Sequence, residues 1–338
     1  MRPKDVVWTL RLMVPLRMPV MLWGSPGIGK TYMAKQTAEE LDYNLIISHP
    51  ITDDPTDYKG LPFAVEINGV HQATFLPFGH FMHALDASRP TIWFFDDMGH
   101  GVPAVQAAAM QLIEERTING NRLPDTLTFL CASNHTTDRA GVHRMIAPLA
   151  NRFGCHLDVE VSTEDWQAWA VVNKVAPEIR SFINFRPALL HQFRPDSGDR
   201  AFASPRSWHK MSMILGTNMP DDLLPQVASG CVGTGPAAEF LGFLRTYRDL
   251  PDIDQVLADP AGTSVPTEPS VVFALCGALV ERIRGNKGPV AAFSKYVARM
   301  QPAYATVAFR DGMAVNTGLL RDATAQGWLR EHREMLID

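Results

Sequence analysis

The chain of 338 residues lacks three features that would each narrow its class. Its four cysteines stand far apart with no Cys-x-x-Cys pair, which argues against a disulfide framework and fits a reducing compartment. Basic residues do not outnumber acidic ones, and the formal charge of −5 argues against a protein that mainly coats nucleic acid or anionic membrane. The longest uninterrupted apolar run, "VVFALCGALV", is about half of a membrane span. We therefore expect a soluble, cytoplasmic protein without membrane insertion.

Biased tracts and internal repeats are also missing, and the composition, 46% hydrophobic and 20% charged, is that of an ordinary globular chain. The length allows about two domains with hydrophobic cores of their own. The N-terminal stretch "MRPKDVVWTLRLMVPLRMPVML" has charged and apolar parts, but Arg11, Arg17 and three prolines interrupt it. We do not expect it to act as a signal peptide.

A glycine-rich segment, "VMLWGSPGIGKTY", is the clearest local motif in the chain. It satisfies the pattern G-x-x-x-x-G-K-[ST] between an expected strand at residues 20–23 and an expected helix at residues 31–41, which is the context of a phosphate-binding loop. In such a loop the backbone N–H groups surround the phosphates of ATP, the lysine reaches the β- and γ-phosphates, and the hydroxyl binds Mg²⁺. The predicted nucleotide-binding residues are Gly24, Ser25, Pro26, Gly27, Ile28, Gly29, Lys30, Thr31 and Tyr32.

Two adjacent carboxylates end a second apolar segment, "TIWFFDD". A phosphate loop requires a neighbouring strand that ends in a metal-linked acid, so we predict that Asp96 holds Mg²⁺ together with Thr31. Asp97 is then placed to polarise the attacking water. The two like charges are tolerable because the divalent cation and Lys30 lie between them and the phosphates. The alternative is a strand that ends in a solvated acidic turn.

The segment after these acids alternates helices and strands. Residues 104–115 favour a helix by composition, and "ERTINGNRLPDTLTF" predicts a hairpin with Asn119-Gly120 as its turn. "TLTFLCASN" predicts a buried strand that ends in the polar amide of Asn134. "HRMIAPLANRF" then predicts a helix that ends at Arg152, before a strand at "CHLDVEV".

This order of motifs resembles the AAA+ superfamily, and within it the MoxR branch, over roughly residues 20–250. The resemblance implies an α/β fold with a five-stranded parallel sheet between helices. It implies that Asn134 is the sensor 1 residue, that Arg152 is the arginine finger offered to a neighbouring subunit, and that Arg206 of "ASPRSW" is sensor 2. Alternatives stay open: Asn134 as a strand cap, Arg139 or Arg144 in the finger role, and Arg206 paired to a local carboxylate.

Two predicted hairpins support the MoxR branch, in which a hairpin breaks the second core helix. "FAVEINGVHQATF" alternates around an Asn-Gly turn as a hairpin should, and the Asn119-Gly120 hairpin precedes the sensor 1 strand. The resemblance implies an ATPase core at residues 1–160 with hairpins at about 61–78 and 115–126. A helical lid follows at 161–250 and a helical C-terminal extension at 251–338. One departure is Asp97, because many such ATPases carry glutamate there, and misplacing a catalytic group by about 1 Å can cost about 100-fold in rate.

An arginine finger offered in trans implies a homo-oligomeric ring, most simply a hexamer. The resemblance further implies an ATPase that remodels or matures a protein complex, with a partner that carries a von Willebrand factor A domain and with a protein client. A nucleic-acid motor of the same clade is the alternative, although the hairpin "AVEINGVHQATF" has no Lys or Arg to grip a phosphate backbone. The ATPase subunit of a metal chelatase is a further alternative, closely related to the remodelling ATPase. A small-molecule kinase would have no use for the sensor and finger residues.

Overall fold

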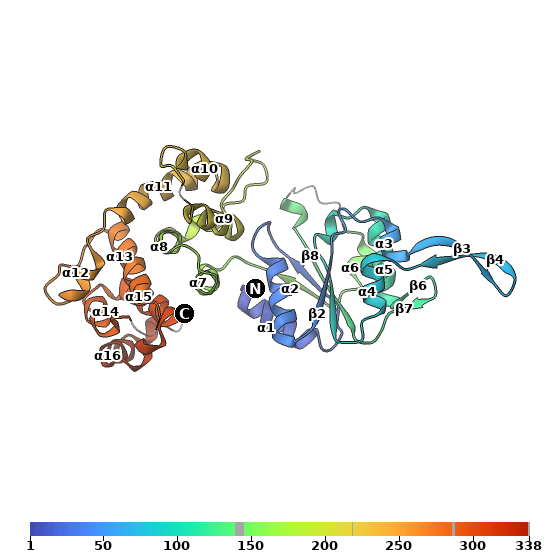
Figure 1. The fold of residues 1–338 in the computed structure, drawn as a ribbon, viewed down its shortest axis with the longest axis horizontal. Coiled ribbons are helices and arrows are strands. Elements are labelled where there is room, and N and C mark those ends of the chain that lie inside the picture. The colour runs from blue at the N-terminus through green and yellow to red at the C-terminus, as the bar shows by residue number, and fades with distance from the viewer. Residues whose placement is uncertain (139–144, 218, 286–287, 337–338) are drawn as a thin grey trace. The chain divides into compact units, whose positions relative to one another are not determined.

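Two compact units make up the protein in the computed structural model, which describes residues 1–138, 145–217, 219–285 and 288–336 (Figure 1). The first unit contains residues 1–161 and 194–198, and the second contains residues 162–193 and 199–338. Among the described residues, all the strands lie in the first unit. The regular secondary structure described for the second unit is helical. The predicted α/β core followed by a helical region is therefore confirmed.

A five-stranded parallel sheet forms the centre of the first unit, with the strand order β2-β5-β8-β1-β9. The strands are β1 (Val20–Trp23), β2 (Asn44–Ser48), β5 (Thr91–Phe95), β8 (Leu127–Ser133) and β9 (Cys155–Asp158). Every residue of β5 and β8 is buried. Strands without an exposed face are typical of a parallel sheet with helices on both sides, which explains why "TIWFF" and "LTFLCAS" show no polar alternation.

Successive side chains of β5 pack on opposite faces of this sheet, and a different set of helices covers each face. Ile92 and Phe94 pack into the cluster beneath α1 (Pro3–Met13) and α2 (Lys30–Leu41). Trp93 and Phe95 point the other way, into the cluster covered by α3 (Pro55–Lys59), α4 (Gly79–Leu85), α5 (Pro103–Glu115) and α6 (Ala147–Ala150). Because side chains of a strand alternate between its faces, one strand supplies both cores.

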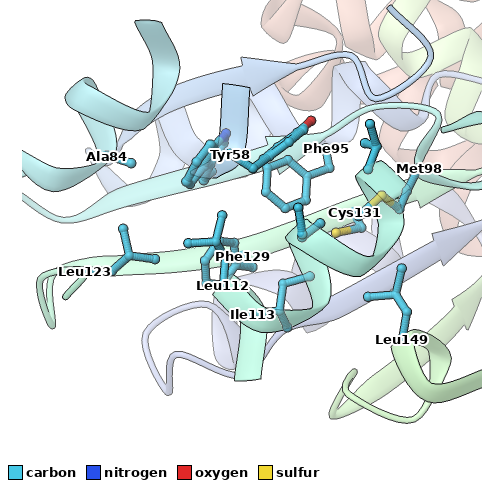
Figure 2. Packing of buried hydrophobic residues seen from close by; sticks show 14 of the residues in the cluster. Tyr58, Ala84, Phe95, Met98, Leu112, Ile113, Leu123, Phe129, Cys131 and Leu149 are labelled. Carbon is cyan, nitrogen blue, oxygen red and sulfur yellow. The ribbon is translucent and has the colours of Figure 1, made fainter. Parts of the chain in front are cut away.

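Tyr58 of α3 lies in the second of these cores, the one that contains Trp93 and Phe95 (Figure 2). Its ring stacks on Trp93 at 6.1 Å and meets Phe95 edge-on at 5.5 Å. Its hydroxyl donates a hydrogen bond to the Asp53 carboxylate, and burial raises the pKa of both groups. The short helix α3 is therefore anchored to the strand that ends at the paired aspartates.

Both predicted hairpins are present in the first unit. β3 (Leu61–Ile67) and β4 (Val70–Leu76) form an antiparallel hairpin between α3 and α4 and extend away from the rest of the unit (Figure 1). The second hairpin is shorter than predicted, since β6 (Thr117–Ile118) and β7 (Asn121–Arg122) have two residues each. The side chain of Asn119, in its turn, donates to the carbonyl of Lys59 at the base of the first hairpin, at 2.8 Å.

The second unit has two hydrophobic clusters, one centred on Trp208, Phe182 and Phe240 and the other on Phe293 and Phe309. Its helices are α7 (Thr163–Val172), α8 (Pro177–Phe185), α9 (Pro205–Leu215), α10 (Leu224–Val232), α11 (Thr234–Arg248), α12 (Ile253–Ala258), α13 (Pro269–Arg282), α14 (Val290–Val297), α15 (Pro302–Val315) and α16 (Ala323–Glu331). The division into a lid and a C-terminal extension near residue 250 stays a prediction.

Short 3-10 turns complete the chain. They are η1 (Met98–His100), η2 (Thr136–Asp138), η3 (Pro187–Leu189), η4 (Thr317–Arg321) and η5 (Arg333–Leu336). Across the parts of the chain that the structure describes, no helix combines the length and the apolar character needed to span a bilayer.

Candidate nucleotide-binding site

The predicted phosphate loop joins β1 to α2 at residues 24–31 and depends on its glycines. Gly27 and Gly29 have φ values of +80° and +102°, in the left-handed region that favours glycine. Gly24 lies so close to β9 that an added Cβ would be 2.9 Å from the carbonyl oxygen of Val159. These three positions let the loop turn tightly between the strand and the helix N-terminus, where N–H groups without helical partners favour an anion.

Lys30 is the first residue of α2 and is 7% exposed, which is unusual for a lysine. Its ammonium donates to the carbonyls of Gly24 at 2.6 Å and Ser25 at 3.1 Å, and to the side-chain oxygen of Asn134 at 2.8 Å. The loop carbonyls and the end of β8 thus hold the charge in place. Phosphate oxygens, which are stronger acceptors than neutral carbonyls, match a cation held in this way.

Thr31 and Asp96 also meet, although 65 positions separate them in the sequence. The Thr31 hydroxyl donates to Oδ2 of Asp96 at 2.6 Å, and the backbone N–H of Asp96 bonds the carbonyl of Ser48 at 2.9 Å. A hydroxyl and a carboxylate oxygen side by side are the hard oxygen ligands that Mg²⁺ takes from a protein when substrate phosphates supply others. These two residues therefore fit a phosphate-bound Mg²⁺.

Asp97 follows β5 in the left-handed conformation, with φ +59° and ψ +42°. Its side chain is 42% exposed, and one carboxylate oxygen lies 3.7 Å from Nδ1 of the buried His100. Aspartate tolerates the left-handed region better than longer side chains do, because its short polar chain can bond locally. This conformation is one that aspartate adopts more readily than glutamate, which gives a physical reason for the shorter side chain at this position.

His100 is a neighbour of the site that sequence reasoning missed. It is 8% exposed, on the 3-10 turn directly after the paired aspartates. The signal was present in the sequence as a histidine three residues after Asp97, which a tight turn brings back toward the carboxylate.

Arg152 follows α6 and does not end it, because that helix spans only Ala147–Ala150. The predicted helix is too long at both ends, because Met145 and Ile146 precede α6 and Asn151 and Arg152 follow it. The chain leaves the helix after Ala150 so that Phe153 can be buried in the core of the sheet face. The Arg152 guanidinium pairs with the carboxylate of Glu114 near the end of α5, a partner that sequence reasoning did not find. Its role as a finger stays a prediction.

The remaining predicted residues are placed as follows. Arg139 and Arg144 lie outside the described residues. Arg206 lies in the first turn of α9, in the second unit, where its exposed side chain forms no ion pair with any residue that the structure describes. Its role in binding nucleotide stays a prediction, and the structure offers no support for a local carboxylate partner.

The arrangement as a whole combines a buried lysine from the loop after β1, two carboxylates directly after β5 and an amide directly after β8. Lys30, Thr31, Asp96 and Asn134 meet through the hydrogen bonds above, and Asp97 follows directly on Asp96. In open α/β sheets, ligands bind outside the carboxyl ends of the strands. The geometry therefore suits a nucleoside triphosphate whose phosphates lie along the loop.

Comparison with known proteins gives an independent result. Residues 20–161 match the model of the AAA family, the ATPase family associated with various cellular activities. No curated protein matches the chain.

Solved structures with similar folds have low identity to the chain. RuvB of Thermotoga maritima, a Holliday junction branch migration motor, is 17% identical with a TM-score of 0.40, over 82% of this chain and 81% of that one. NtrX of Brucella abortus is 14% identical with a TM-score of 0.43, over 91% of this chain and 68% of that one. An ATPase from Cytophaga hutchinsonii is 12% identical with a TM-score of 0.37, over 90% and 80%.

The family model spans the phosphate loop, the paired aspartates and all five strands of the sheet. AAA ATPases bind ATP, usually with Mg²⁺, and the glycine loop, Lys30 and the Thr31–Asp96 pair supply the groups for both. We conclude that residues 20–161 form an ATPase domain of the AAA family and that this protein hydrolyses ATP.

Proposed function

We propose that this protein is a MoxR-like AAA+ ATPase that couples ATP binding and hydrolysis to the remodelling or maturation of a protein complex. It acts as a homo-oligomeric ring, most simply a hexamer. Its partner carries a von Willebrand factor A domain, and its client is a protein. The β3–β4 hairpin between α3 and α4 is the observation that carries this proposal.

One face of that hairpin is apolar and exposed. Directly opposed residues share a face, and the register pairs Leu61 with Leu76 and Phe63 with Thr74. Leu61, Phe63 and Leu76 are 48%, 60% and 44% exposed, and Val70 near the turn is 62% exposed. Exposed apolar side chains gathered on one projecting element are typical of a surface that contacts other proteins.

Charge on the two hairpins argues against a nucleic-acid motor. Residues 61–78 contain no Lys or Arg, and Glu66 adds a negative charge. In the second hairpin, Arg116 turns inward and donates to the carbonyls of Pro124 and Leu127 at 2.7 and 2.8 Å, so that it serves the fold. Only Arg122 is left as an exposed cation among residues 115–126. Binding a phosphate backbone depends on several such cations.

The geometry of the site supports the following roles in ATP hydrolysis. Backbone N–H groups of the loop and Lys30 bind the β- and γ-phosphates of ATP. Thr31 and Asp96 would hold Mg²⁺, which would supply electrostatic stabilisation of charge on the phosphate oxygens. Asp97 accepts a proton from the attacking water. Asn134 accepts a hydrogen bond from Lys30 and helps to position that water. Arg152 of the adjacent protomer stabilises the charge that develops in the transition state, a contribution worth about 10³- to 10⁵-fold in other nucleotide hydrolases.

The choice between a protein client and nucleic acid can be tested by measuring ATP turnover with each ligand. Casein, as an unfolded protein with apolar segments, is expected to stimulate hydrolysis with little dependence on salt. Single- and double-stranded DNA are expected to have no effect between 50 and 200 mM salt. Stimulation by DNA that is lost as salt rises would overturn the proposal.

The partner can be sought with the Asp97→Asn variant, which is expected to retain bound ATP and therefore a closed ring. Tagged Asp97→Asn protein with ATP is compared with the Lys30→Ala variant, which is expected not to retain ATP. A von Willebrand factor A protein recovered only with Asp97→Asn supports the proposed partner. Replication or repair proteins and DNA recovered in its place would contradict it.

A further inference from the structure

A line of side-chain contacts starts immediately before the phosphate loop. Trp23 is the last residue of β1, directly before Gly24. Its indole N–H donates to Nδ1 of His156 on β9 at 2.9 Å. The other ring nitrogen of His156, Nε2, lies 2.9 Å from the carbonyl oxygen of Ala150. Because Nδ1 accepts, the neutral ring carries its proton on Nε2 and donates it to Ala150. His156 therefore bridges β1 and α6.

Ring stacking ties this bridge to the sensor position as well. The indole of Trp23 stacks on His135, with ring centroids 6.3 Å apart and an interplanar angle of 18°. The ring of His156 lies edge to edge with the indole, with centroids 6.2 Å apart and an interplanar angle of 19°, as the hydrogen bond between them requires. His135 directly follows Asn134, the residue that accepts a hydrogen bond from Lys30. The indole at the end of β1 thus contacts both His156 on β9 and His135, the residue next to the sensor amide.

The other end of the bridge lies at the segment that carries Arg152. Ala150 is the last residue of α6, two positions before Arg152. On the far side of that arginine, the N–H of Gly154 bonds the carbonyl of Pro19 at 2.9 Å. An added Cβ on Gly154 would lie 2.4 Å from the side chain of Met18, so this contact is close-packed. The backbone that positions Arg152 is therefore held at one side by Met18 and Pro19, directly before β1, and at the other by His156.

We propose that His156 is a positioning residue for ATP hydrolysis, which links the phosphate loop through Trp23 to the placement of Arg152. The nucleotide state of one protomer thereby adjusts the arginine that the same protomer offers to its neighbour. The proposal rests on the finger role proposed for Arg152. It assigns to His156 no contact with ATP, so its loss acts on turnover in the neighbouring site and not on ATP affinity.

Three substitutions separate the two hydrogen bonds of the bridge. His156→Gln places an amide near Nε2 and can keep the bond to Ala150, and His156→Asn places one near Nδ1 and can keep the bond from Trp23. Trp23→Phe removes the indole donor but retains a ring against His135. Each is expected to lower kcat by about 10- to 100-fold, because misplacement of a catalytic group by about 1 Å costs that much. The KM for ATP is expected to stay within about twofold.

His83→Asn is the matched control, because His83 is an exposed histidine on α4 without a place in the bridge. It should leave kcat and KM unchanged. Melting temperatures of all variants are measured in parallel, so that a loss of folding is not read as a loss of rate. A bridge variant that folds and keeps the wild-type kcat would overturn the proposal.

Mixed rings decide where His156 acts. Asp97→Asn protomers cannot hydrolyse ATP but offer an intact finger, so mixing them with His156→Asn protomers should restore turnover in the latter. Mixing Asp97→Asn protomers with Arg152→Ala protomers tests the finger role of Arg152 in the same way. Rescue of Arg152→Ala but not of His156→Asn would overturn the role proposed for His156 and leave the finger role of Arg152 standing. Full activity of Arg152→Ala without any partner would overturn the finger role and the proposal together.

Discussion

The ATPase site and the β3–β4 hairpin are two regions of one unit with opposite construction. At the site, polar and charged groups are drawn into the protein and held there: Lys30 is 7% exposed with three acceptors, and Asn134 is 6% exposed. On the hairpin, apolar groups are turned outward, and Phe63 is 60% exposed. The first arrangement preorganises charge for a reaction, because groups already oriented need not reorganise as the reaction proceeds. The second leaves apolar area to be buried by a partner.

The largest expected effect is at Asp97, and it tests the preorganised side of the comparison. Asp97→Asn removes the proton acceptor and is expected to lower kcat by about 10²- to 10⁴-fold, the usual contribution of a general base. Asparagine also tolerates the left-handed φ of +59°, so the backbone should not change. Single-turnover hydrolysis and ATP binding are measured together. Hydrolysis at the wild-type rate would show that Asp97 is not the base.

Lys30 is expected to have the next largest effect. Lys30→Ala removes the cation and leaves the buried oxygens of Gly24 and Asn134 without their donor. We expect a loss of about 10²- to 10³-fold in kcat/KM, by analogy with the removal of one preorganised donor from a charged site. Steady-state kinetics with titration of a fluorescent ATP analogue check this. Unchanged ATP affinity would mean that the loop does not hold the phosphates as described.

Gly60 tests how firmly the hairpin is attached at its base. It has φ +84°, and an added Cβ would lie 2.7 Å from the carbonyl oxygen of Leu76. Gly69 in the hairpin turn has a similar φ of +77° with no atom within 4 Å of such a Cβ. Gly60→Ala is expected to destabilise the first unit by about 1–3 kcal/mol through strain and overlap, more than Gly69→Ala, which meets strain alone.

Thermal unfolding followed by calorimetry compares these two glycine variants. A shift of about 2–4 °C for each kcal/mol is expected for a unit of this size. Equal shifts for Gly60→Ala and Gly69→Ala would show that the close approach to Leu76 is relieved at no cost.

The smallest expected effect concerns the apolar face of the hairpin. Phe63→Ser removes the largest exposed ring on that face, whereas Glu66→Ser changes the opposite face. Losing the burial of a phenylalanine, worth about 1.5–3 kcal/mol, should raise the casein concentration for half-maximal stimulation by about tenfold or more. Glu66→Ser should not raise it. Equal behaviour of the two variants would contradict an apolar contact surface.

Several elements were predictable because their signals are local. The loop at residues 24–31 is set by glycines and a lysine within one short segment, and the β3–β4 hairpin by alternation around Asn68-Gly69. The end of the helix before Arg152 was mispredicted, because burial of Phe153 decides where that helix stops. The second hairpin is shorter than its pattern suggested, and Arg116 there turns back onto the carbonyls of Pro124 and Leu127.

The sequence by itself indicated the chemistry: a phosphate loop, a candidate metal-binding pair of residues and an acid next to them, each recognisable from residue type and spacing. The tertiary structure alone decided which of these groups touch. Lys30 meets Asn134 across 104 positions, Arg152 meets Glu114, and Trp23 meets His156 across 133 positions. The physical reason is that strand order places β8 and β9 on either side of β1, and distant segments become neighbours only once the sheet has formed.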